Sequence, residues 1–143
     1  MNWYSDWFLA DEDEAVASIA TDDEGHTFDD WPHLSMRSVG ETELEALWAI
    51  LRGRRKRPAR VSELLLVVDE EVGPAVGWIV PEFIGALAAV KKTDVPTLAG
   101  MWHKCECLSE LEAETVRDVL REMTGFARRA KRAKKPVLEL STW

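Results

Sequence analysis

Alternating and continuous apolar stretches predict the strands of this protein. Aromatic and β-branched residues that alternate with polar ones favour a half-buried strand, and a short continuous apolar run favours a buried one. The runs LLLVV and AVGWIV are separated by a turn-like DEEVGP, which predicts a β-hairpin. The predicted strands are 3–9, 33–39, 64–68, 75–80 and 137–142.

Apolar residues three and four positions apart predict the helices. The clearest stripe runs from Val116 to Ala130, and shorter stripes follow residue 41 and Pro81. Helix starts are expected where a capping residue precedes a glutamate by three positions. Gly53 and Pro136 are expected to mark two helix ends. The expected capping pairs are Asp11 with Glu14, Thr42 with Glu45 and Ser109 with Glu112.

The order of these elements predicts one domain over residues 1–143. The expected fold class is α/β or α+β, with a single mixed sheet of about five strands and helices packed on it. A chain of 143 residues can bury a sizeable core without a disulfide or a metal ion.

Charge is distributed unevenly along the chain, whose net charge is −8. Residues 1–45 hold thirteen acidic residues and one basic residue, which gives −12. Residues 46–143 hold thirteen acidic and seventeen basic residues, which gives +4. Basic residues cluster at 52–60 and 128–135. Such asymmetry influences how a protein meets its partners more than how it folds.

Motifs for catalysis or metal binding are weak. No phosphate-binding loop, nucleophile elbow or HExxH pattern occurs. His103, Cys105 and Cys107 are weak candidates for a metal site, since structural zinc usually needs four ligands. The sequence therefore predicts no cofactor and no catalytic residue. The alternative is a small, metal-assisted enzyme that uses His26, His33 or His103 with carboxylates.

The cysteines and the apolar runs indicate in which compartment of the cell the protein is expected. Cys105 and Cys107 would point the same way in a strand and diverge in a helix, so we expect no disulfide and a reducing compartment. The N-terminal residues lack the pattern of a signal peptide, and no apolar run is long enough to span a bilayer. We therefore expect a cytoplasmic protein with no membrane partner.

The acidic opening predicts a surface for a basic protein partner, such as a toxin. Carboxylates would steer the encounter, and an exposed indole would anchor it. Nucleic acid is disfavoured because the chain is acidic overall. The alternative is a homo-oligomer in which acidic and basic segments of two copies meet. The expected partner-binding residues are Asp22, Asp23, Glu24, Asp29, Asp30 and Trp31.

Several segments resemble small bacterial α/β proteins, some of which serve as immunity proteins beside polymorphic toxins. These segments are LEALWAIL with Trp48, VPEFIGAL, Trp102, and the closing LREMTGFARRAKRAKKPVLELSTW. The resemblance is one of pattern over the C-terminal two-thirds, and it transfers no functional residue. It implies a non-catalytic binding protein of the immunity or inhibitor type.

Overall fold

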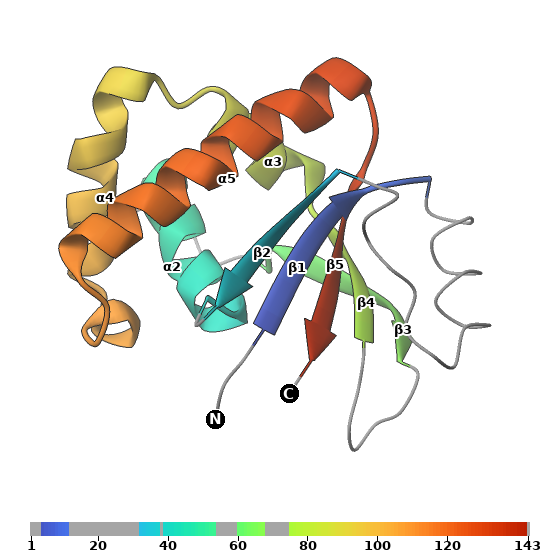
Figure 1. Cartoon of the computed structure of the whole chain (residues 1–143), viewed down its shortest axis with the longest axis horizontal. Helices are drawn as coiled ribbons and strands as arrows, with labels where there is room; N and C mark the ends of the chain where they lie inside the picture. The colour runs from blue at the N-terminus through green and yellow to red at the C-terminus, as the bar shows by residue number, and fades with distance from the viewer. Residues whose placement is uncertain (1–3, 12–31, 38, 54–59, 68–74, 143) are drawn as a thin grey trace.

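The computed structural model describes residues 4–11, 32–37, 39–53, 60–67 and 75–142 (Figure 1). These residues form one sheet, four α-helices and two short 3-10 helices. The elements are β1 (Tyr4–Leu9), β2 (His33–Arg37), α2 (Glu41–Arg52), β3 (Ser62–Val67), β4 (Ala75–Ile79), α3 (Pro81–Ala88), η2 (Lys92–Asp94), α4 (Val95–His103), η3 (Glu106–Leu108), α5 (Ala113–Ala133) and β5 (Val137–Thr142).

The sheet has five strands in the order β2-β1-β5-β4-β3. All four neighbouring pairs are antiparallel, so the prediction of a five-strand sheet with helices is confirmed in its α+β form, and the sheet is antiparallel rather than mixed. The predicted β3–β4 hairpin is also confirmed. The last strand, β5, lies at the centre, where it joins the pair β1–β2 to the pair β3–β4.

The four helices cover one face of the sheet, and α5 crosses it diagonally (Figure 1). The predicted α5 stripe is confirmed, because its apolar side chains lie in the main core. Aromatic rings connect the layers: Phe83 of α3 packs edge-on against Trp7 of β1 at 6.2 Å and against Trp48 of α2 at 5.3 Å between centroids. Phe126 of α5 lies 6.3 Å from Trp7. This cluster holds three helices to the sheet.

The opposite face of the sheet is apolar as well. Side chains alternate between the two faces of a strand, so Trp7 enters the helical core while Phe8 points away from it. Phe8, Val76 and Leu138 are fully buried, and with Ala10 and Leu140 they form a second cluster. Trp78 is half-buried and packs against this second cluster.

Two predicted helix starts are wrong by two or three residues. Thr42 and Ser109 were expected to cap their helices, but the capping positions are Gly40 and Glu112. α2 begins at Glu41, and the carboxylate of Glu43 accepts a hydrogen bond from the backbone N–H of Gly40 at 3.1 Å. α5 begins at Ala113 after an extended Glu112. The predicted helix end at Gly53 is confirmed; its φ of 86° is a conformation that glycine adopts without steric cost.

Membrane-spanning character is not found in the described part of the chain, where no helix is both long and apolar enough to cross a bilayer. The longest helix, α5, has 21 residues and exposes charged side chains along the surface that faces away from the core.

Candidate functional site: a basic groove along α5

The six residues expected to bind a partner lie outside the described residues. These are Asp22, Asp23, Glu24, Asp29, Asp30 and Trp31, and the predicted helix after Asp11 and the histidine His26 fall there too. Their role stays a prediction.

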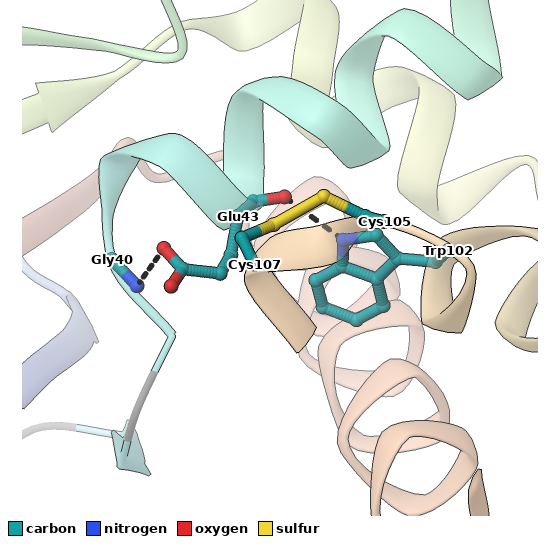
Figure 2. Close-up of a disulfide and its surroundings, with 5 residues drawn as sticks. All are labelled: Gly40, Glu43, Trp102, Cys105 and Cys107. Atoms are coloured by element: carbon teal, nitrogen blue, oxygen red, sulfur yellow. Dashed lines mark hydrogen bonds between the residues drawn. A yellow bond between two sulfur atoms is a disulfide. The ribbon is translucent and has the colours of Figure 1, made fainter. Parts of the chain in front are cut away.

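Cys105 and Cys107 form a disulfide, with their Cα atoms 5.3 Å apart. The prediction that this pair would stay unbridged is wrong because the segment is neither strand nor α-helix. Cys105 is extended and Cys107 lies in the 3-10 turn η3, so the two side chains converge. Figure 2 shows the bridge beside the indole of Trp102, whose Nε1 donates to the Glu43 carbonyl oxygen at 2.9 Å.

The disulfide removes the basis for the expected reducing compartment, because disulfides are rare in reducing compartments. Cytoplasmic location stays a prediction. Bridged sulfurs are also unavailable as thiolate ligands. His103 does not turn toward them: its Nε2 lies 2.7 Å from the Leu111 carbonyl oxygen, to which it donates. Among the described residues, no group of three His, Cys, Asp or Glu side chains could hold a metal ion.

Carboxylates gather between α2 and the sheet. Glu139 of β5 is buried and accepts a hydrogen bond from Trp7 Nε1 at 3.2 Å. Glu41 of α2 accepts a hydrogen bond from Ser62 Oγ at 2.9 Å. Burial raises the pKa of Glu41, and the nearby negative charges of Glu139 and Glu45 raise it further.

Glu41→Gln is expected to stabilise the fold at neutral pH. The pKa of Glu41 is higher in the folded protein than in the unfolded chain. The stability that Glu41 contributes is therefore present in full below its usual pKa of 4.5, and it is lost as pH rises through the pKa of the folded protein. Glutamine removes the partly buried charge, and its amide oxygen can still accept from Ser62. Thermal unfolding from pH 3 to 8 measures the effect. The advantage of the variant over wild type should shrink toward acid pH.

Glu122→Gln is the control, because this carboxylate is exposed on α5. A Glu41→Gln variant that is less stable than wild type at pH 7, or a difference that does not change with pH, contradicts the assignment. Neither Glu41 nor Glu139 lines any of the grooves described below.

A groove lined by basic side chains runs beside α5. Two adjoining hollows of about 430 and 700 Å³ share Lys92, Gly125 and Arg128. One wall is α5, and the other comes from the end of α3, from η2 and from the start of α4. We call this surface the α5 groove. Its residues are Ala88, Lys92, Val95, Pro96, Arg117, Arg121, Thr124, Gly125, Arg128, Lys131 and Arg132.

Helical spacing explains why the cations line up. Residues four positions apart occupy neighbouring places on one helix surface, so Arg117 and Arg121 stand in a row that continues, past Gly125, to Arg128 and Arg132. Gly125 faces open space: a Cβ built there meets no atom within 4 Å. The glycine therefore leaves a gap between the arginines.

Carboxylates are absent from the residues that line the α5 groove. An ion pair nearby joins Arg121 to Asp118 at 3.2 Å, with both side chains more than half exposed. An exposed pair of this kind contributes little to stability and exchanges easily for another anion. The described surface of the groove is therefore positively charged.

Arg128 is fixed in place at the middle of the groove. Its Nε donates to the Ala88 carbonyl oxygen at 3.3 Å, and its terminal NH2 nitrogen donates to the Val90 carbonyl oxygen. These carbonyls lie at the C-terminal end of α3, where a cation is favourable. A guanidinium has five N–H donors, so others remain for a ligand in the groove.

Arg128→Ala is expected to lower the free energy of unfolding by about 1.5–3 kcal/mol, the range for hydrogen bonds that involve a charged group. The carbonyl oxygens at the end of α3 would lose their donor. Urea unfolding measures the change. Arg129→Ala, which removes an exposed arginine that does not line the groove, should stay within about 0.5 kcal/mol of wild type. Equal effects of the two changes would contradict the role of Arg128.

Part of this groove could be predicted from the sequence. The basic cluster 128–135 of the sequence contains Arg128, Lys131 and Arg132, which line the groove. The four-residue spacing of Arg117 and Arg121 is a further signal, because it places both arginines on one surface of a helix. Lys92 could not have been assigned, because only the packing of α3 and α4 on α5 brings it near Arg128.

Comparison of the chain with protein-family models, with curated proteins and with solved structures finds no match.

Proposed function

We propose that this chain is a non-catalytic protein-binding module, and that the α5 groove receives an acidic, partly apolar segment of a partner protein. The observation that carries the proposal is the row of cations along the groove with no lining carboxylate among them. Charge complementarity of this kind sets partner choice and association rate.

The composition of the groove favours an acidic peptide over a nucleic acid. Single-stranded nucleic acids stack their bases on aromatic side chains, and the described lining residues include no aromatic. The net charge of −8 also opposes a long polyanion more than a short segment. Val95 and Pro96 offer apolar contact beside the arginines, as a peptide with both acidic and apolar residues requires.

The test measures the affinity of a fluorescent peptide in which Asp or Glu alternates with Leu or Phe. Arg121→Glu is compared with Arg129→Glu, which makes the same change of charge on the same helix but outside the groove. Because Arg129 directly follows Arg128 in the chain but does not line the groove, both variants make a similar change to the electric field around the groove. The difference between them therefore reports direct contact with the peptide. We expect Arg121→Glu to weaken binding at least tenfold, and Arg129→Glu to weaken it clearly less.

Two results would overturn the proposal. One is a peptide that does not bind the wild-type protein, and the other is an equal loss of affinity in both variants. A peptide with Asn and Gln in place of the acids is the ligand control. It should bind much more weakly, and the affinity of the acidic peptide should fall as salt rises.

A second candidate function rests on the −12 charge of residues 1–45. In this version the protein is an inhibitor or immunity-type module that binds a basic partner through Asp22, Asp23, Glu24, Asp29, Asp30 and the anchor Trp31. Changing all five acids to amides should abolish binding of a lysine-rich probe peptide. Unchanged binding would remove this candidate, and it would leave the α5 groove proposal untouched.

Opposite charges on one chain also make self-association a candidate. The observation that favours it is the coexistence of the basic α5 groove with the acidic residues 1–45 in one chain. Light scattering at low and high salt tests it. An oligomer that dissociates as salt rises supports self-association, and a monomeric mass at low salt excludes it.

A further inference from the structure

A separate cavity lies at the end of the sheet, between α3 and the C-terminal end of α5. Its volume is about 410 Å³, within the range of small-molecule sites. Trp78, Ile84 and Gly85 form one side, at the end of β4 and along α3. We call it the lysine-rimmed cavity, because Lys131, Lys134 and Lys135 form the other side. It shares only Lys131 with the α5 groove.

The interior of this cavity is apolar and open. Ile84 is buried at its base, and the half-buried Trp78 offers an aromatic surface. Gly85 widens the space, since a Cβ built at this helical position meets no atom within 4 Å. A glycine inside a helix is unfavourable relative to alanine. Here it leaves room that any larger side chain would fill.

The rim carries three ammonium groups and no carboxylate. Lys131, Lys134 and Lys135 are exposed, and none of them is held in an ion pair among the described residues. Cations at a helix C-terminus also favour the helix dipole, which is the simpler explanation for them. That explanation does not account for the apolar cavity that the three lysines surround.

The backbone of Lys134 supports a role in binding. Its φ of 55° is left-handed, and its N–H donates to the carbonyls of Ala130 and Lys131 to end α5. Glycine is the residue usually found at this position, because any side chain carries a steric cost there. Non-glycine residues in such conformations occur often at binding sites. The chain places an ammonium at the mouth of the cavity in spite of this cost.

We infer that the lysine-rimmed cavity binds an amphiphilic organic anion. Its apolar body, an acyl chain or a ring, lies against Trp78 and Ile84, and its carboxylate or phosphate meets the three lysines. Charge complementarity and the volume of the cavity select this class of ligand over a peptide. The inference does not depend on the proposed function, because the ligand and all but one of the lining residues differ.

Calorimetric titration with octanoate tests the inference. Octan-1-ol has the same apolar body without the charge, acetate has the charged head without the body, and octyl phosphate compares the two head groups. We expect saturable one-to-one binding of octanoate or octyl phosphate. Octan-1-ol should bind at least tenfold more weakly, and acetate should show no binding. The tighter of the two anions identifies the preferred head group.

Two variants locate the binding without weakening the fold. Gly85→Leu fills the cavity with a residue that suits a helix better, so it should remove binding while the protein unfolds at an equal or higher temperature. Lys134→Gly relieves the left-handed backbone and removes one ammonium, so it should stabilise the fold and weaken binding at least threefold. Lys104→Gly, at the end of α4 and outside the cavity, should leave binding within twofold of wild type.

The inference is overturned by any of three results. The first is the absence of saturable binding of both anions at millimolar concentration. The second is equal affinity for octanoate and octan-1-ol. The third is binding that Gly85→Leu and Lys134→Gly leave unchanged. Because the acidic peptide is a different probe, its binding can fail while octanoate binds, or the reverse, and the two failures are distinguishable.

Discussion

Phe83→Ala is expected to lower the free energy of unfolding by about 3–5 kcal/mol, the usual range for removing a buried phenylalanine ring. Phe83 is fully buried and is the ring that touches both Trp7 of the sheet and Trp48 of α2. Its loss removes apolar contact area and two edge-to-face interactions, and it leaves a cavity where the helices meet the sheet. Urea unfolding, followed by tryptophan fluorescence, measures the change.

Met101→Ala is the control, because its side chain is 40% exposed on α4. It should change stability by no more than about 0.5 kcal/mol. A Phe83→Ala variant as stable as Met101→Ala would mean that the aromatic cluster does not join the layers. A variant that does not fold agrees with a large loss, and Phe83→Leu, which keeps most of the volume, should then recover the fold.

Leu138→Ala is expected to lower the free energy of unfolding by about 2–5 kcal/mol. Leu138 is fully buried in the central strand β5, on the face of the sheet opposite the helices. Its neighbours across the strands are Phe8 of β1 and Trp78 of β4. A large loss would show that the protein depends on two apolar layers, one on each face of the sheet.

Ser35→Ala is the matched control, since Ser35 is exposed on the outermost strand β2. It should stay within about 0.5 kcal/mol of wild type. If Leu138→Ala costs less than about 1 kcal/mol, below the range for large-to-small core changes, the second face contributes little. The described fold would then rest on the helical core alone.

Local patterns explain why most of the elements could be predicted. β1, the β3–β4 hairpin and the stripe of α5 depend on periodicity within one segment, which the sequence displays directly. The strand order could not be predicted in this way. β5 pairs with both β1 and β4, and those contacts join residues at least sixty positions apart. Outside the β3–β4 hairpin, the antiparallel arrangement follows from such long-range pairing and from no local signal.

The start of α5 was predicted wrongly because contacts outside the helix determine where it begins. Ser109 and Glu112 have the spacing of a capping box, but the 3-10 turn η3 and the His103–Leu111 hydrogen bond hold this segment outside the helix until Ala113. The disulfide was missed for the same reason. Its geometry depends on a turn that neither helical nor strand periodicity describes.

The central claim is that the α5 groove binds an acidic segment, and amide NMR shifts test it most directly. Titration of the labelled protein with the acidic peptide should move the signals of Lys92, Arg121, Gly125 and Arg128, which line the groove. The signal of Ser35, exposed on the outermost strand β2, should move little. Shifts confined to residues outside the groove, or no shifts at all, would contradict the account.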